Sequence, residues 1–248
     1  IFYLTYGNQA HCMSKCSDFA YSYGKLKHHD FDKGVMNVEK RTALVAGASG
    51  LTGSHLIKFL CNNEAYEKVT IIVRQAVSYS HPKLTIKIKN LDQVKTNDFE
   101  GVDDFFCCLG STMKKAGSKE AFEQVDLLAP VQMAKHAQAQ GAKHMLVISA
   151  MGANPNSSIY YNRIKGKMEE QVSELQLPQV SIFRPSLLMG NRQEFRLGER
   201  LGSIFMKLLK SSFIGPLKKY RAIEAQQVAF AMMQKALSMQ SKNVSIYE

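Results

Sequence analysis

The sequence lacks the features that mark membrane-spanning, secreted and disulfide-stabilised proteins. No apolar run approaches the roughly 18 residues that a helix needs to cross a bilayer, and no basic flank precedes an apolar stretch near the N-terminus. The 248 residues include only five cysteines, an odd number that argues against a disulfide framework. These absences favour a globular protein in a reducing compartment, and we expect a cytoplasmic location.

Patterns typical of metal-binding and nucleic-acid-binding proteins are also missing. Cys12 and Cys16 lie near His11, but no second ligand pair follows at the spacing of a zinc site, so we expect no metal centre. Cys107 and Cys108 are neighbours on a predicted strand, where successive side chains point to opposite faces, so we expect packing residues rather than a redox pair. Lysine and arginine outnumber aspartate and glutamate by 32 to 21, a net charge of +11. Because no nucleic-acid module accompanies this charge, we predict no direct nucleic-acid contact.

Strands and helices alternate along most of the chain. Residues 1–38 show no sustained period and are expected to form a poorly ordered extension, whereas residues 39–248 form the folded domain. Apolar runs predict strands at 42–46, 69–73, 84–88, 104–109, 145–149, 180–183 and 244–247. Helical periodicity predicts helices at 51–62, 119–140 and 163–174, followed by a mainly helical remainder. This alternation predicts an α/β fold with a parallel sheet that helices cover on both faces.

A glycine-rich turn separates the first predicted strand from the first predicted helix. Its sequence is Gly47-Ala48-Ser49-Gly50-Leu51-Thr52-Gly53. In a dinucleotide-binding turn, Gly47 would bend the chain, Gly50 would let the backbone approach a pyrophosphate, and Gly53 would let the helix pack closely. The helix N-terminus at Leu51 and Thr52 would face the phosphates with partial positive charge. The alternative is a glycine-rich loop that binds no ligand.

Arg74 directly follows the second predicted strand. In folds that prefer NAD, an acidic residue near this position binds the ribose hydroxyls. A cation favours the additional phosphate of NADP instead, and Ser49 can add a hydroxyl donor. We therefore predict NADP(H) as the cofactor, with an ordinary surface arginine as the alternative.

A second constellation joins a serine, a tyrosine and a lysine. Tyr161 and Lys165 lie four residues apart, on one face of a helix, and Ser149 ends the fifth predicted strand, where parallel sheets bind ligands. A free tyrosine has a pKa of about 10, and a nearby ammonium group lowers it toward the range that proton transfer needs. Ser149 can donate a hydrogen bond to a substrate oxygen while Tyr161 passes the proton. Tyr160 has Ile164 four residues on, so Tyr161 is the better candidate, and an ordinary surface Tyr–Lys pair is the alternative.

These motifs resemble those of the atypical short-chain dehydrogenases/reductases of the Tat-interacting-protein oxidoreductase group. The similarity runs from about Arg41 to the C-terminus and includes the stretches Phe106-Cys107-Cys108-Leu109-Gly110-Ser111-Thr112, Phe183-Arg184-Pro185 and Asn191-Arg192-Gln193-Glu194. The resemblance implies a Rossmann-type doubly wound parallel sheet in three layers, which binds NADP(H). A small helical substrate-side region is expected from about residue 186.

The resemblance also implies roles for further residues. Asp126 matches the position at which most short-chain dehydrogenases carry an asparagine that completes a catalytic tetrad with Ser149, Tyr161 and Lys165. Leu109 and Gly110 are expected to line the adenine and ribose side of the cofactor, and Pro185 and Leu188 to lie against the nicotinamide. The substrate pocket is expected to include Phe195, Arg196, Phe205 and Phe213.

The function that the sequence favours is an NADP(H)-dependent oxidoreductase acting on a small carbonyl or alcohol substrate. The first alternative is an NADP(H)-bound regulatory or redox-sensing protein with little turnover, because some members of the resembled group are associated with regulatory roles. The second is a nucleotide-sugar epimerase or dehydratase, although the segment after the sixth strand leaves little material for a sugar-binding subdomain. A homodimer or a regulatory protein partner stays open.

Overall fold

The computed structural model describes residues 40–190, 222–238 and 243–248, which all lie in the unit Val38–Glu248. The predicted extension at 1–38 and the predicted pocket residues between 195 and 213 fall outside the described residues. No helix in the described ranges is both long and apolar enough to span a membrane.

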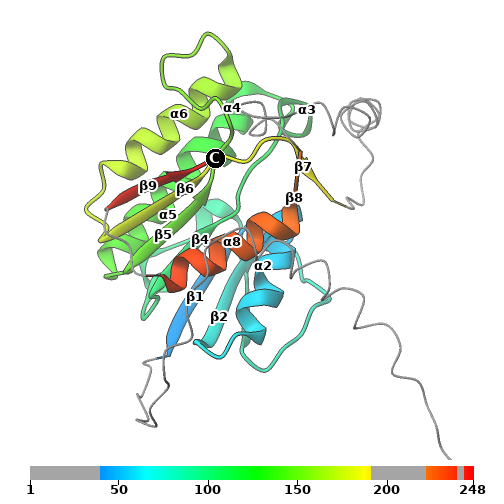
Figure 1. Ribbon diagram of the computed structural model, residues 1–248, viewed down its shortest axis with the longest axis vertical. Helices are drawn as coiled ribbons and strands as arrows, with labels where there is room; N and C mark the ends of the chain where they lie inside the picture. Colours follow the sequence, from blue (N-terminus) through cyan, green and yellow to red (C-terminus); the bar gives the residue numbers. More distant parts are fainter. Residues whose placement is uncertain (1–39, 191–221, 239–242) are drawn as a thin grey trace, which may run out of the picture. The chain divides into compact units, whose positions relative to one another are not determined.

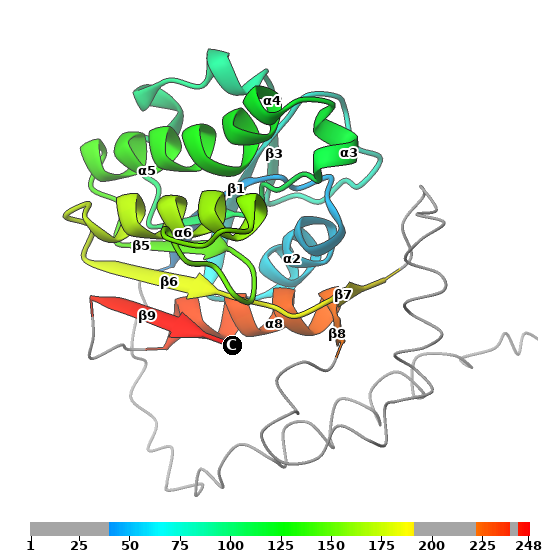
Figure 2. The same ribbon diagram turned by 90° about the horizontal axis from the view of Figure 1, so that it is seen from above.

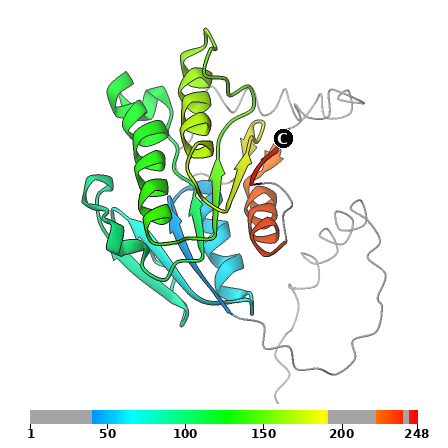
Figure 3. The same cartoon turned by 90° about the vertical axis from the view of Figure 1, so that its left-hand side faces the viewer.

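Seven parallel strands form one sheet in the order β3-β2-β1-β4-β5-β6-β9 (Figure 1). They are β1 (Arg41–Ala46), β2 (Tyr66–Val73), β3 (Leu84–Ile88), β4 (Asp104–Cys107), β5 (His144–Ile148), β6 (Gln179–Phe183) and β9 (Val244–Tyr247). The strand arrows point to one edge of the sheet (Figure 3), so the carboxyl ends of all seven strands share that edge. The order of the first six strands is that of a Rossmann fold, in which ligands bind at the carboxyl edge.

Helices cover both faces of the sheet, as Figure 2 shows. One face carries α5 (Ala129–Ala139) and α6 (Tyr160–Ser173), and the other carries α2 (Leu51–Asn62) and α8 (Ala225–Leu237). The sheet has a hydrophobic core on each face, because successive side chains of a strand point to opposite faces. Phe105 belongs to the core on the α5/α6 side, and Phe106 to the core on the α2/α8 side. The predicted three-layer α/β fold is confirmed.

Cys107 and Cys108 follow the same alternation. Cys107 is buried in the α5/α6 core, and Cys108 packs against the α2/α8 core. Their separation onto opposite faces agrees with the predicted packing role. Burial raises the pKa of Cys107 to about 11 and also raises that of Cys108.

The predicted helix at 119–140 is interrupted in its middle. It divides into α4 (Lys119–Glu123), a π-helical turn labelled η3 (Gln124–Leu128), and α5. Pro130 has no backbone N–H, so the α-helical bond to the carbonyl of Asp126 cannot form there. This missing bond gives a physical reason for the wider π turn, which places Asp126 in the interior.

Other predicted boundaries shifted by a few residues. The predicted helix at 163–174 begins at Tyr160, so Tyr161 lies in its first turn, and the strand predicted at 104–109 ends at Cys107. Short elements that the sequence did not predict are α3 (Met113–Ala116), η1 (Leu91–Gln93), η2 (Thr96–Phe99), β7 (Leu188–Met189) and β8 (Ile223–Glu224). β7 and β8 pair with each other in parallel and form a separate two-stranded sheet.

Candidate functional site

The glycine turn packs tightly between β1, β4 and α2. Gly47 has a φ of +80°, and a Cβ there would come within 2.6 Å of the Cys108 carbonyl. A Cβ on Gly53 would lie 2.2 Å from the Gly47 carbonyl oxygen, so only glycine lets the helix approach the turn this closely. Gly50, in contrast, is exposed. Two of the three glycines therefore serve packing, and the middle one leaves the backbone open to a ligand.

The N-terminus of α2 carries backbone donors that no side chain caps. Gly50 is the N-cap residue, and the first turn contains no acidic residue. The first-turn N–H groups of Leu51, Thr52 and Gly53 thus remain available for an anion, and the helix dipole adds favourable charge. Ser49 is exposed beside them. This cradle fits the pyrophosphate of a dinucleotide.

Arg74 emerges beside this turn. Ala46 at the end of β1 pairs with Ile72 on β2, so Arg74 leaves the sheet at the level of the glycine turn. It is exposed, and no hydrogen bond or ion pair joins it to another described residue.

A buried ion pair lies at the carboxyl edge of the neighbouring strands. Lys165 Nζ on α6 is 2.8 Å from Asp126 Oδ1 on η3, and both side chains are almost completely buried. Asp126 Oδ2 accepts a 2.8 Å hydrogen bond from the Ser111 amide, and Lys165 Nζ lies 3.5 Å from the carbonyl oxygen of Ile148. Burial opposes the charge of Lys165, but the charges of Asp126 and Tyr161 outweigh it and raise the pKa of Lys165.

Ser149 follows directly after β5 and brings its hydroxyl to the same edge. Its backbone N–H donates to the Phe183 carbonyl at 2.7 Å. Its Oγ is buried and has no hydrogen-bond partner. A buried hydroxyl without a partner is costly unless a ligand or water satisfies it, so this atom is suited to a substrate oxygen.

Two adjacent tyrosines differ in what their hydroxyls contact. The Tyr160 hydroxyl donates to Glu123 at 2.9 Å and to the Lys119 carbonyl at 3.2 Å. The Tyr161 ring packs against Phe122, with 5.7 Å between centroids, and its hydroxyl has no partner among the described residues. Of the two tyrosines, Tyr161 is therefore the one whose hydroxyl remains available.

The remaining predicted cofactor residues lie around this edge. Leu109 and Gly110 follow β4, and a Cβ on Gly110 would stand 3.6 Å from Asp126 Oδ1. Pro185 follows β6, where its carbonyl accepts from the Met151 amide at 3.1 Å. Leu188 begins β7.

Two residues near the site were missed by the sequence reasoning. Ser111 acts through its backbone amide, which any residue supplies, although its place directly after Gly110 was a signal. Gly190 lies over the start of α2, where a Cβ would come within 2.7 Å of Leu51 Cδ1.

No cluster of three or more His, Cys, Asp or Glu side chains suited to a metal ion occurs in the described ranges. Cys12, Cys16 and His11 lie outside those ranges.

Comparison with known proteins identifies the class that this fold and site define. A family model described as NAD(P)H-binding matches residues 47–200. MoeE5 in complex with UDP-glucuronic acid and NAD is 16% identical, with a TM-score of 0.64 and coverage of 83% of this chain and 75% of that chain. A putative NAD-dependent epimerase/dehydratase from Bacillus halodurans is 16% identical, with a TM-score of 0.60 and coverage of 83% and 92%. The chain has an NAD(P)-binding Rossmann fold.

Two relatives define the family more closely. Protein HTATIP2 of Rattus norvegicus is 32% identical over 217 residues, 85% of this chain and 87% of the relative. The mitochondrial protein FMP52 of Candida glabrata is 29% identical over 221 residues, 83% of this chain and 89% of the relative. The chain belongs to the NAD(P)H-binding family that includes Protein HTATIP2, and the resemblance to the Tat-interacting-protein group is confirmed.

Proposed function

We propose that this protein is an NADP(H)-dependent oxidoreductase that interconverts a small carbonyl compound and its alcohol. The observation that carries the proposal is the unpartnered, buried Ser149 hydroxyl beside the Lys165–Asp126 ion pair, at the edge of the sheet where the glycine turn lies. A cofactor-binding protein without chemistry has no need of such a set.

Each residue has a distinct task in this proposal. Ser149 Oγ donates a hydrogen bond to the substrate oxygen, and the Tyr161 hydroxyl gives a proton to that oxygen or takes one from it. Lys165 supplies positive charge beside Tyr161 and a donor for the nicotinamide ribose. Asp126 holds the Lys165 ammonium and, through the Ser111 amide, the loop after β4. NADP(H), when bound, supplies or accepts the hydride.

The preference for NADP(H) over NAD(H) rests on Arg74. Its exposed guanidinium beside the glycine turn can form charge-assisted bonds to the additional phosphate. We expect Arg74→Ala to weaken NADPH binding by about tenfold, equivalent to about 1.4 kcal/mol, and to leave NADH binding unchanged. Fluorescence titration with both cofactors measures this difference, and equal losses for the two would contradict the assignment.

The catalytic claim is tested by following NADPH absorbance with a panel of aldehydes and ketones. Tyr161→Phe removes the proton donor, so we expect turnover to fall by a factor of about 10² to 10⁴. Tyr160→Phe is the matched control, because it makes the same change one residue away on a hydroxyl that bonds to Glu123. An unaffected Tyr161→Phe enzyme, or a wild-type chain that turns over no substrate, would defeat the proposal.

The alternative of a redox-sensing protein finds little support in the thiols of the described ranges. Burial raises the pKa of Cys61, Cys107 and Cys108, which keeps them in the unreactive thiol form. A regulatory protein that binds the cofactor without turnover differs from the enzyme in the same substrate panel, since it would bind NADPH and consume none.

We further propose a cytoplasmic location, a small-molecule substrate and no direct nucleic-acid contact. FMP52 relatives carry the word mitochondrial in their names, so fluorescence imaging of the tagged full-length protein with a mitochondrial marker is the informative measurement. Coincidence with the marker would overturn the cytoplasmic proposal. Light scattering of the purified chain would distinguish a homodimer from a monomer.

A further inference from the structure

Arg184, the first residue after β6, makes a bidentate contact with Glu169 on α6. Arg184 Nε lies 3.0 Å from Glu169 Oε1, and Nη2 lies 2.6 Å from Glu169 Oε2. Glu169 is buried, with 5% of its surface exposed. A guanidinium that meets a carboxylate with two parallel bonds defines direction as well as distance, so this contact restrains both the height and the rotation of the helix.

The contact acts on the helix that carries the proposed proton donor. Tyr161, Lys165 and Glu169 follow one another at intervals of four residues, which places them along one gradually turning stripe of α6. Glu169 is one turn, about 6 Å of helix, beyond Lys165. A shift or rotation of α6 at Glu169 therefore moves the Lys165 ammonium and the Tyr161 hydroxyl with it.

The backbone on either side of Arg184 bonds to the segment that follows β5 and carries Ser149. The Phe183 carbonyl accepts from the Ser149 amide at 2.7 Å, and the Pro185 carbonyl accepts from the Met151 amide at 3.1 Å. Phe183 and Pro185, the two neighbours of Arg184, thus bond to the chain at Ser149 and Met151, while the Arg184 side chain bonds to α6. This stretch is a direct mechanical connection between Ser149 and the Tyr161–Lys165 pair.

We infer that Arg184 is a positioning residue, which acts through Glu169 to hold Tyr161 and Lys165 in register with Ser149. The inference rests on the proposed function for its catalytic consequence, but its geometric content is independent of turnover. Arg184 also contacts Glu248 through Nη1 at 3.3 Å. The contact with Glu248 uses a different guanidinium nitrogen from those that bond to Glu169.

The principal variant is Arg184→Lys, which keeps the charge but lacks the planar two-point donor. We expect kcat to fall by about tenfold, since small misplacements of reacting groups are costly, while the dissociation constant for NADPH changes by less than about twofold. Glu248→Ala is the matched control, because it removes only the outer side-chain contact and is expected to leave kcat unchanged. An Arg184→Lys enzyme with wild-type kcat would overturn the inference.

A readout independent of activity is the acylation of lysine side chains, followed peptide by peptide by mass spectrometry in the full chain. The Lys165 side chain is 3% exposed, whereas Lys167 on the same helix is exposed and serves as the internal control. In Arg184→Lys we expect faster acylation of Lys165, an unchanged rate at Lys167, and continued protection of the buried Cys61 thiol against alkylation. Unchanged protection of Lys165, or simultaneous loss of protection at Lys165 and Cys61, would overturn the inference.

A double variant keeps the test usable if Arg184→Lys unfolds. Arg184→Met combined with Glu169→Leu removes both charges, so no buried carboxylate is left without a partner. We expect a folded protein with the same increase in Lys165 acylation. If the wild-type chain turns over no carbonyl substrate, the proposed function fails, and the acylation result by itself decides whether Arg184 positions α6.

Discussion

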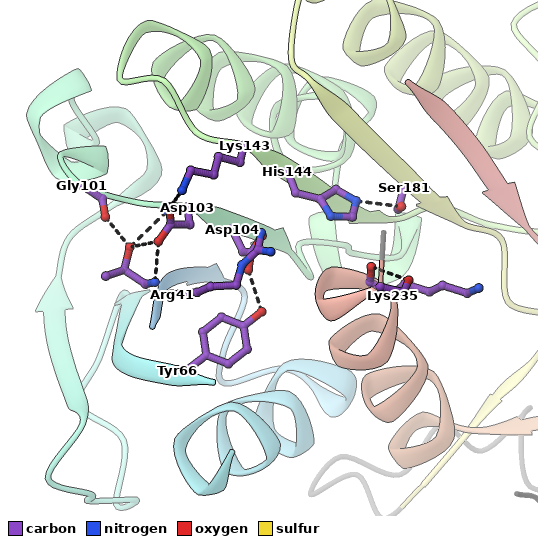
Figure 4. A network of polar contacts seen from close by, with 11 residues as sticks. Arg41, Tyr66, Gly101, Asp103, Asp104, Lys143, His144, Ser181 and Lys235 are labelled. Carbon is purple, nitrogen blue, oxygen red and sulfur yellow. Dashed lines mark hydrogen bonds and ion pairs between the residues drawn. The ribbon is translucent and has the colours of Figure 1, made fainter. Parts of the chain in front are cut away.

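An ion pair with a buried carboxylate lies at the amino ends of the strands and another at their carboxyl ends, and the two pairs differ in their surroundings. At the amino edge, Arg41 lies 2.5 Å from Asp104 Oδ1, and the Tyr66 hydroxyl donates to Asp104 Oδ2 at 2.7 Å (Figure 4). These three residues come from β1, β4 and β2, which are hydrogen-bonded neighbours. At the carboxyl edge, Lys165 and Asp126 come from α6 and η3 instead.

The difference lies in what each pair leaves available. Both oxygens of Asp104 are taken by side chains of adjacent strands, so the amino-edge pair mainly joins three strands to one another. At the carboxyl edge, Asp126 uses one oxygen for Lys165 and the other for the Ser111 amide, and the neighbouring Ser149 hydroxyl has no partner. A buried ion pair alone therefore does not identify a site. The position of the Lys165–Asp126 pair at the carboxyl ends of the strands, where ligands bind in Rossmann folds, is what makes it a candidate.

The largest expected effect is a loss of turnover when the Asp126 side chain is removed. Asp126→Ala leaves the Lys165 charge without its partner and frees the Ser111 amide, so we expect turnover to fall by about 100-fold or more. Asp126→Asn keeps the shape and an acceptor for the Ser111 amide, and we expect it to retain activity within about tenfold of wild type. Steady-state rates of both variants with NADPH measure this. Equal losses in the two would show that charge, rather than placement, is what Asp126 supplies.

The next effect concerns stability at the opposite edge. Asp104→Ala leaves Arg41 and the Tyr66 hydroxyl without their partner, and we expect the free energy of unfolding to fall by about 3 to 5 kcal/mol. The fraction that remains folded is expected to have the wild-type turnover, because the amino edge lies away from the proposed site. Urea unfolding together with rates per folded molecule checks both parts. Normal stability with lost activity would reverse the roles assigned to the two edges.

The smallest effect is a pH dependence of stability at the amino edge. Burial lowers the pKa of His144 to about 4, while its Nε2 bonds to Ser181 at 2.9 Å. As the pH falls from 7 to 5.5, this histidine is protonated in the unfolded state but not in the folded state. The free energy of unfolding therefore falls by about 1 kcal/mol. Burial raises the pKa of Asp104 to about 6, so there the folded state takes up a proton first and gains stability over the same range.

Because the two pH effects have opposite signs, substituting His144 or Asp104 separates them. His144→Gln removes the loss of stability caused by His144 and keeps the gain caused by Asp104. The stability of His144→Gln relative to wild type should therefore rise by about 1 kcal/mol as the pH falls from 7 to 5.5. Asp104→Asn removes the gain, and its relative stability should fall instead. Urea unfolding at the two pH values measures both differences. Parallel pH profiles for wild type and His144→Gln would show that His144 is not held in its neutral form.

Much of the architecture was predictable from local sequence. The helix 51–62 and the strands at 84–88 and 244–247 have the predicted ends, since apolar periodicity and the glycine turn define them locally. The π turn was not predicted, because Pro130 within a helical pattern indicates an irregularity without specifying its form. The start of α6 at Tyr160 was also missed, since the residue at its N-cap is Ile159, which makes no side-chain cap hydrogen bond.

The sequence by itself determined the order of strands and helices along the chain, the glycine turn, and the four-residue spacing of Tyr161 and Lys165. All of these depend on residues close together in the chain, where backbone geometry and periodicity decide the outcome. Only the tertiary structure decided that Asp126 meets Lys165, and that Arg184 holds Glu169. Such contacts join elements separated along the chain, and their geometry depends on how helices pack against the completed sheet.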